Sequence, residues 1–244
     1  MKTRVLYNQP KEKLSSCDDI PLLEKILTIA GRSHGRVYGG FVRDVIVPRL
    51  IDPNNEVNFN DVDIWFTKQE DVNNFLRGVN LYLEPLDFNL DFSKRSIPKP
   101  GVLPNTFART QYSLWTNKNF VSFIDVIVCK VIPVDDFNVN CLTFQYVNDK
   151  KKAKSFGPDS TTKLIDDIMD KQAYMLLSYP NKLISGRLSN EVFERRVNNN
   201  YLNKGWKVFC FDRFQFPRKI SDEWIDDTFK PIARKYFDKL NKLQ

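Results

Sequence analysis

The 244 residues carry a formal net charge of +7, and 42% of them are hydrophobic, a composition typical of a globular protein with a sizeable core. No apolar run is long enough to cross a membrane, and the polar N-terminus lacks the apolar region of a secretory signal peptide. Four widely spaced cysteines and a single histidine include no CxxC pair, which argues against structural zinc. We therefore expect a protein without a membrane partner in a reducing cytoplasm, that of the host cell if the protein is viral.

The first half of the chain predicts alternating helices and strands. Apolar residues at helical spacing, with caps and breakers at their ends, predict helices over residues 18–31, 40–48 and 68–79. The second of these is expected to stop at Pro48, because proline lacks a backbone N–H. Runs with strand composition predict strands over residues 35–38 and 61–66. Residues 1–17 are expected to form a polar lead-in.

The second half changes character near residue 150. Before that point, two strands predicted over residues 107–116 and 119–132 should form a hairpin, and an ordered segment follows over 135–147. Residues 81–104 show no clear pattern. After that point the sequence predicts helices over residues 161–177, 188–205 and 220–243. We thus expect an α/β (α+β) domain over residues 18–150 and a smaller helical domain over 151–244.

The "DVD" of residues 61–63 places two carboxylates on one face of a predicted strand, because strand side chains alternate with a period of two. Carboxylates a few ångströms apart repel by roughly 4 kcal/mol in a partly buried setting, so Asp61 and Asp63 need a compensating cation. Asp125 lies in the otherwise apolar "FIDVIV", where an unpaired carboxylate is costly. If the two strands are neighbours, three oxygen ligands converge, as a two-metal phosphoryl transfer site with Mg²⁺ or Mn²⁺ requires.

The "GGFVRD" of residues 39–44 predicts the complementary half of such a site. Gly39 and Gly40 lack side chains, so backbone amides there can approach an anion closely. The helix that follows directs its positive end to the same place. Arg43, one turn into that helix, can add a charge-assisted contact to a triphosphate. Asp44 can either brace Arg43 or bond a ribose hydroxyl of the nucleotide.

Each of these motifs has an ordinary structural explanation when it is taken alone. A "GG" before a helix is usually a turn, and "DVD" is usually the solvated end of a strand. Their combination is far rarer, since GGxVRD followed by DxD arises by chance in roughly one chain of this length in ten thousand. The combination therefore favours a phosphate and metal site.

The stretch "YGGFVRD" followed by "DVDIWF" resembles the GGxVRD…DxD signature of the class II nucleotidyltransferases. These are the tRNA CCA-adding enzymes and bacterial poly(A) polymerases of the DNA polymerase beta-like superfamily. Further on, "DDFNVNCLTF" resembles the family motif RRDFTINAL and matches it at Asp136, Phe137, Asn140 and Leu142. Asp125 matches an acidic strand residue that precedes this motif in the family. The resemblance covers roughly residues 20–145.

The resemblance implies a polymerase beta-like domain with a small mixed sheet and flanking helices. It implies transfer of a nucleoside monophosphate from an NTP, ATP foremost, to a hydroxyl, with an RNA 3′ end as the acceptor. The net charge of +7 suits such a polyanion. The metal ligands and catalytic residues that it implies are Asp61, Asp63 and Asp125. The nucleotide-binding residues that it implies are Gly39, Gly40 and Arg43 for the triphosphate, with Asp136 and Asn140 for the sugar and the adjoining loop.

Departures from the family keep other functions open. Val134 and Asp135 stand where the family has two arginines, and the later EDxxR base-selecting motif has no close match. The charged "NEVFERRV" has a different spacing and suits an exposed helix face. Two alternatives therefore remain. One is an enzyme that nucleotidylates a protein hydroxyl, and the other is a catalytically degenerate nucleotidyltransferase fold that serves in binding or as a partner subunit.

Overall fold

The computed structural model describes residues 19–55, 59, 61–86, 88–96, 108–116, 119–129, 136–147, 150–157, 159–176 and 190–209. The predicted lead-in, Val134, Asp135 and the predicted helix over 220–243 lie outside these residues. The chain divides into two compact units. The first takes the described residues of Met1–Val45, Asn54–Val131 and Phe144–Lys152, and the second those of Ile46–Pro53, Ile132–Thr143 and Ala153–Gln244. Both units draw on separate stretches of chain, and the domain bounds at residues 17 and 150 stay a prediction.

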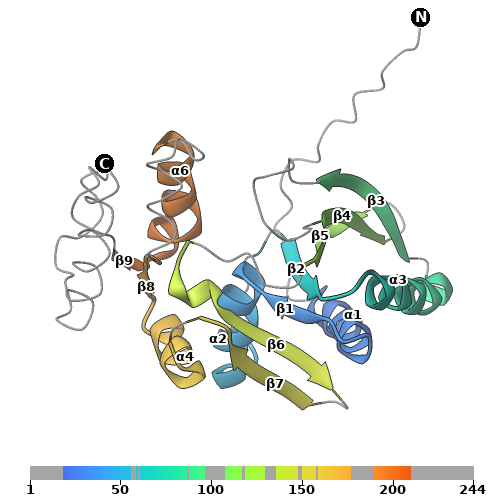
Figure 1. The fold of residues 1–244 in the computed structure, drawn as a ribbon, viewed down its shortest axis with the longest axis horizontal. Helices are drawn as coiled ribbons and strands as arrows, with labels where there is room; N and C mark the ends of the chain where they lie inside the picture. The colour runs from blue at the N-terminus through green and yellow to red at the C-terminus, as the bar shows by residue number, and fades with distance from the viewer. Residues whose placement is uncertain are drawn as a thin grey trace, which may run out of the picture. The chain divides into compact units, whose positions relative to one another are not determined.

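The described strands include a mixed sheet of seven, in the order β3-β4-β5-β2-β1-β6-β7 (Figure 1). In chain order they are β1 (Arg36–Tyr38), β2 (Asp61–Phe66), β3 (Phe88–Ser96), β4 (Ala108–Thr116), β5 (Asn119–Val128), β6 (Leu142–Val147) and β7 (Lys150–Ser155). β2 and β5 pair in parallel, whereas β4 is antiparallel to β5 and β1 is antiparallel to β2. The predicted mixed α/β class and the hairpin β4–β5 are confirmed. β3 lies within residues 81–104, a stretch that shows no clear pattern in the sequence.

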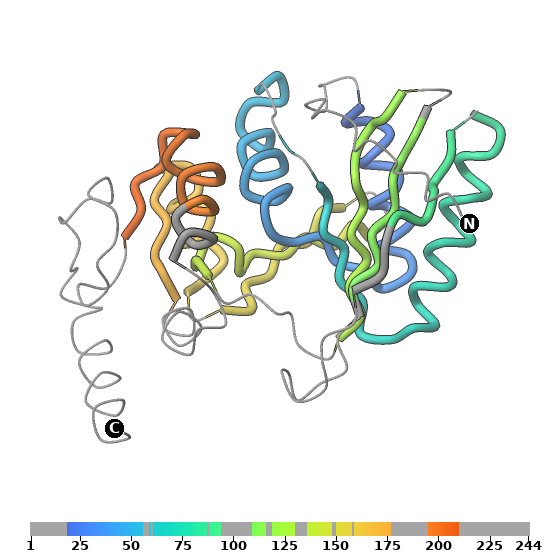
Figure 2. The backbone as a smooth tube through the Cα atoms, turned by 90° about the horizontal axis from the view of Figure 1, so that it is seen from above, coloured from blue at the N-terminus to red at the C-terminus, as the bar shows by residue number. Residues whose placement is uncertain are grey.

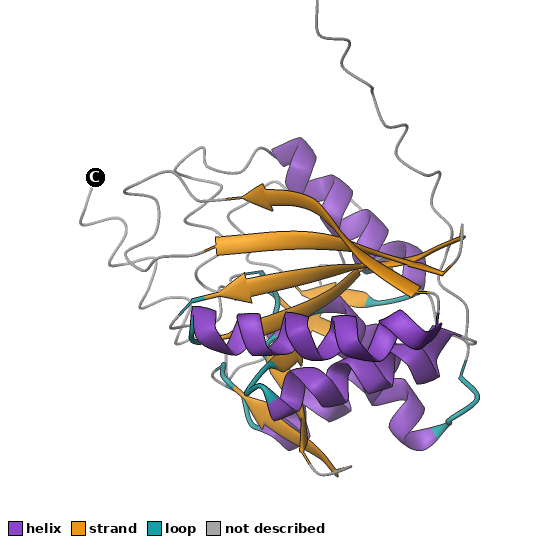
Figure 3. Cartoon of the chain, turned by 90° about the vertical axis from the view of Figure 1, so that its right-hand side faces the viewer, coloured by secondary structure: helices purple, strands orange, loops and turns teal. Residues whose placement is uncertain are grey.

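Two helices of the first unit, α1 (Ile20–Arg32) and α3 (Gln69–Leu83), cover one face of the sheet, as Figures 2 and 3 show. Val62, Ile64 and Phe66 of β2 are buried, and the Phe66 ring lies 5.3 Å from that of Phe75 on α3. Because side chains alternate along a strand, the intervening Asp61 and Asp63 project from the opposite face. The apolar side of β2 thus anchors the strand and leaves its acids on the side away from these helices.

The helical segment after the glycine turn runs past Pro48, which corrects the expectation that proline ends it. A π-helical turn, η2 (Val42–Ile46), leads directly into α2 (Val47–Ile51). Pro48 lies in the first turn of α2, where a missing N–H is tolerated, and the wider π-helical turn before it changes the hydrogen-bond spacing. Such π-helical turns are frequently found at functional sites.

The second unit combines helices with a pair of short strands. Its elements are α2, η4 (Asn138–Asn140), α4 (Thr161–Met169), β8 (Gln172–Tyr174), α6 (Asn190–Asn200), η5 (Leu202–Lys204) and β9 (Lys207–Phe209). The helix predicted over 161–177 is wrong beyond Met169, because Lys171 has a positive φ of 52° and β8 pairs with β9 in parallel. The helix predicted over 188–205 is confirmed in its central part by α6.

One irregularity interrupts the hairpin β4–β5. Trp115 pairs with Phe120, but Leu114 pairs with Ser122, so Val121 is an extra residue on β5. Beyond this bulge the strands pair regularly, and Gln111 lies opposite Asp125. Directly opposed residues of an antiparallel pair share a face of the sheet, so this register decides which residues of β4 join the acids.

Candidate metal and nucleotide site

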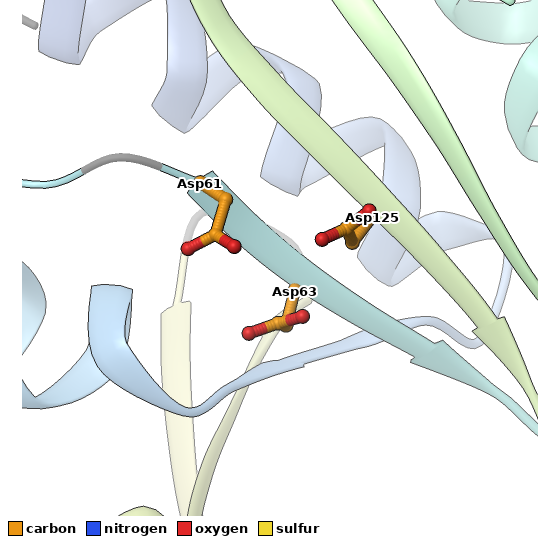
Figure 4. Close-up of side chains that lie close together, drawn as sticks. All are labelled: Asp61, Asp63 and Asp125. Carbon is orange, nitrogen blue, oxygen red and sulfur yellow. The ribbon is translucent and has the colours of Figure 1, made fainter. Parts of the chain in front are cut away.

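Three aspartates converge on the face of the sheet that carries the acids of β2. Asp63 of β2 and Asp125 of β5 are register partners in the parallel pair, and Asp61 lies two residues before Asp63. One oxygen from each of the three lies within 4.8 Å of the others. Figure 4 shows the three carboxylates directed toward one another. The structure thus brings these residues together, and metal binding by them stays a prediction.

Asp125 is the most deeply buried of the three, with a residue exposure of 0%. Its Oδ2 accepts a hydrogen bond from Nη2 of Arg109. Its Oδ1 is buried and has no hydrogen-bond partner among the described residues. An unpaired buried carboxylate oxygen is costly, and Oδ1 of Asp125 could accept a bond from a bound ligand or ion.

Arg109 of β4 belongs to this cluster, although sequence reasoning missed it. Its Nη2 also lies 3.8 Å from Oδ2 of Asp61, so one guanidinium contacts two of the acids. Burial opposes its charge, but the hydrogen bond and charge of Asp125, with the charges of the other two acids, raise the pKa of Arg109 above its ordinary value. Arg109 therefore remains positively charged. No motif indicated it, because its proximity depends on the register of β4 against β5.

Burial and nearby negative charge also act on Asp61 and Tyr38. Partial burial, followed by the charge of Asp125, raises the pKa of Asp61, while Arg109 and then Arg43 lower it. Tyr38 of β1 pairs with Asp63, and burial followed by the charge of Asp63 raises the pKa of this phenol. Tyr38 therefore stays a neutral hydroxyl beside the acids, and sequence reasoning missed it as well.

The glycine turn lies directly against the acid cluster. Gly39 has a φ of +74°, a conformation that residues with a Cβ rarely adopt. A Cβ on Gly39 would lie 3.0 Å from Oδ2 of Asp63, so even an alanine would press on the carboxylate. Gly40 begins the helical segment, and a Cβ there would be 3.7 Å from Nη2 of Arg43. The two motifs that are separate in the sequence therefore meet in the fold.

Arg43 and Asp44 form a buried ion pair in the π-helical turn. Nε and Nη2 of Arg43 each donate to a different oxygen of Asp44 at 2.7 Å, and their side chains are 4% and 10% exposed. This two-point contact fixes the guanidinium, so the structure agrees with the first of the two roles considered for Asp44. The charge of Arg43 also reaches the acids, since it lowers the pKa of Asp61.

Asp136 and Asn140 belong to the second unit, where they form a hydrogen-bonded cluster of their own. Oδ1 of Asp136 accepts from the Phe137 backbone N–H at 2.7 Å and from Nδ2 of Asn140 at 3.0 Å. Nδ2 of Asn140 also donates to the Tyr201 hydroxyl at 2.9 Å. These contacts explain their presence structurally, and a part in nucleotide binding stays a prediction.

No protein-family model matches the sequence, and no curated protein matches it either. In the described ranges, no helix is both long and apolar enough to cross a membrane.

Proposed function

We propose that this protein is a metal-dependent nucleotidyltransferase, which transfers a nucleoside monophosphate from an NTP, ATP foremost, to the hydroxyl of an RNA 3′ end. The observation that carries the proposal is the convergence of Asp61, Asp63 and the fully buried Asp125, with ligand oxygens within 4.8 Å. Carboxylates this close repel one another strongly unless cations lie between them.

The donor set suits the ion that this chemistry needs. All three ligands are carboxylate oxygens, which Mg²⁺ and Mn²⁺ prefer, and Oδ1 of Asp125 is buried without a hydrogen-bond partner. When bound, such an ion would neutralise phosphate charge and make the attacking hydroxyl a better nucleophile. Asp61, Asp63 and Asp125 would hold it from two adjacent strands, which fix their positions.

The glycine turn and the π-helical turn supply the other contacts. The absence of a side chain at Gly39 lets the turn pack closely against Asp63, and a phosphate can approach the backbone N–H groups of such a turn. Arg43, held in place by Asp44, offers a positive charge close enough to lower the pKa of Asp61. Together these groups would orient a triphosphate against the acids, and the net charge of +7 favours a polyanionic acceptor.

The proposal is tested by incubating the full chain with labelled NTPs, Mg²⁺ and RNA primers. We expect primer extension that is lost in Asp61→Ala and in Asp63→Ala. The matched control is Asp91→Ala, which removes an exposed carboxylate from β3, outside the cluster, and should extend primers as the unsubstituted chain does.

The same reaction separates the alternatives. Label that appears on protein instead of RNA would favour a protein-nucleotidylating enzyme. An unsubstituted chain that transfers no label to RNA or protein, and shows no calorimetric binding of NTP with Mg²⁺, would contradict the enzyme and favour the degenerate fold.

A further inference from the structure

The position of Arg109 raises the question of what neutralises the acids before a metal ion arrives. Nη2 of this residue bonds to Oδ2 of Asp125 and lies 3.8 Å from Oδ2 of Asp61. The guanidinium thus occupies space beside the same oxygens that would serve as metal ligands.

The polar atoms around this contact are incompletely paired. Nε of Arg109 and Oδ1 of Asp125 are both buried, and neither has a hydrogen-bond partner among the described residues. A structural ion pair in a protein interior normally uses the remaining donors and acceptors of both partners, since unpaired ones are costly. Here one guanidinium nitrogen and one carboxylate oxygen have no partner. This pattern suits an ion pair in which another cation can replace the guanidinium.

The positive charge of Arg109 affects both the acids and an incoming metal ion. A guanidinium on Asp125 reduces the repulsion among three carboxylates, but it also repels a divalent cation that approaches the same oxygens. The Arg109 side chain is 40% exposed, so it has a route away from the acids, whereas Asp125 is fixed and fully buried.

We infer that Arg109 is a built-in counter-ion, which holds the cation position between Asp125 and Asp61 in the metal-free protein and competes with a divalent metal ion for it. This inference rests on the metal site of the proposed function. It goes beyond that function, because it makes the affinity for metal a balance between ion and guanidinium rather than a property of the three acids alone.

The experiment measures Mn²⁺ affinity directly, by adding the full chain to Mn²⁺ without nucleotide. Binding is followed as the loss of the electron paramagnetic resonance signal of free Mn²⁺. Arg109→Gln removes the competing charge, and we expect it to bind Mn²⁺ about tenfold more tightly, the factor that corresponds to about 1.4 kcal/mol. Arg109→Lys keeps a charge but loses the planar fork that reaches both carboxylates, and it should bind with an affinity between the two. This second variant also answers the question if Arg109→Gln does not fold.

The matched control is Arg36→Gln. Arg36 lies on β1 with its guanidinium 5.5 Å from the ring of Trp65, and it has no described ion pair with the acids. Its loss changes the net charge equally and should leave the Mn²⁺ affinity unchanged. A second measurement uses melting temperatures. In chelator, Arg109→Gln should melt below the unsubstituted chain, and Mn²⁺ should raise its melting temperature by more.

Each outcome is decisive for the inference. Equal Mn²⁺ affinity in Arg109→Gln and the unsubstituted chain overturns the competition while leaving the proposed function intact. Weaker binding in Arg109→Gln overturns it too and makes Arg109 a residue that positions Asp125 for the metal. Absence of Mn²⁺ binding in every variant overturns both the competition and the metal site of the proposed function.

Discussion

The acid cluster of the first unit contains unpaired buried polar atoms, whereas the cluster around Asn138 in the second unit is fully hydrogen-bonded. In the second unit, Nδ2 of Asn138 donates to Asp159 and Asp167, and its Oδ1 accepts from the Tyr174 backbone N–H. In the first unit, Oδ1 of Asp125 and Nε of Arg109 have no partner, and they are the only such buried side-chain atoms in the described ranges. Complete pairing stabilises a fold, whereas unpaired buried atoms cost free energy, a cost that the proposed metal site would offset.

The largest effect should come from removing a charge at the incompletely paired cluster. Asp63→Asn keeps the shape of the side chain but removes one of three carboxylates. We expect nucleotidyl transfer to fall by at least about a hundredfold, since even groups that only support a metal ligand contribute ten- to a hundredfold. The free energy of unfolding should stay the same or rise, because one source of repulsion is gone. Primer extension and urea unfolding test this, and a large loss of stability would contradict it.

A second effect should show whether the turn at Gly39 has a part in activity that another left-handed glycine, Gly205, does not have. Gly39→Ala and Gly205→Ala place a Cβ at nearly the same φ, +74° and +77°, so each should lose about 1 kcal/mol of unfolding free energy. Only Gly39→Ala brings a Cβ to 3.0 Å from Oδ2 of Asp63, whereas Gly205→Ala meets Nζ of Lys171 at 3.9 Å. We expect about a tenfold loss of transfer in the first alone, equivalent to about 1.4 kcal/mol. Equal activities in the two variants would show that the turn does not position Asp63.

A third substitution, at the fully hydrogen-bonded cluster around Asn138, should lower stability and leave activity unchanged. Asn138→Ala leaves two acidic acceptors and one backbone N–H without their partner, so unfolding free energy should fall by about 2–4 kcal/mol. Transfer per folded molecule should not change. The control is Asn74→Ala, an exposed asparagine on α3, which should alter stability by less than about 0.5 kcal/mol. A specific loss of activity in Asn138→Ala would give the second cluster a functional part.

The smallest effect concerns Cys141, which is a buried free thiol, as is Cys129. Burial, followed by the charges of Asp136 and Asp159, raises the pKa of Cys141 from 9.0 to about 12. From pH 9 upward the unfolded chain releases this proton while the folded chain keeps it, so stability is complete below pH 9 and declines toward pH 12. Urea unfolding across this range should show a shallower decline in Cys141→Ala, and identical slopes would count against the raised pKa.

Much of the acid cluster was predictable because it depends on local rules. The period of two places Asp61 and Asp63 on one face of β2, and an isolated acid in an apolar strand marks Asp125. The meeting of these strands needed only that they be neighbours, which the parallel register confirms. The glycine turn was predicted from Gly39 and Gly40, and its left-handed φ agrees with that prediction.

What could not be predicted depends on registers and contacts between distant segments. Tyr38 and Arg109 join the cluster through pairing across strands, which no short motif encodes. The π-helical turn that carries the helix past Pro48 is a tertiary adjustment that overrides the local signal of a proline. A continuing helix was expected where β8 lies. This strand instead pairs with β9, more than thirty residues away in the chain, and Gln172 pairs with Lys207.

The extra residue Val121 on β5 decides from which face of the sheet the side chain of Arg109 on β4 projects. Were the ladder to continue from the Trp115–Phe120 pair without a shift, Thr110 would stand opposite Asp125 and Arg109 would project from the other face of the sheet. The electrostatics of the cluster are therefore decided by a count of residues near a hairpin turn. A single insertion or deletion in β4 between that turn and Arg109 would exchange a guanidinium for a hydroxyl at the acids, without altering any acid.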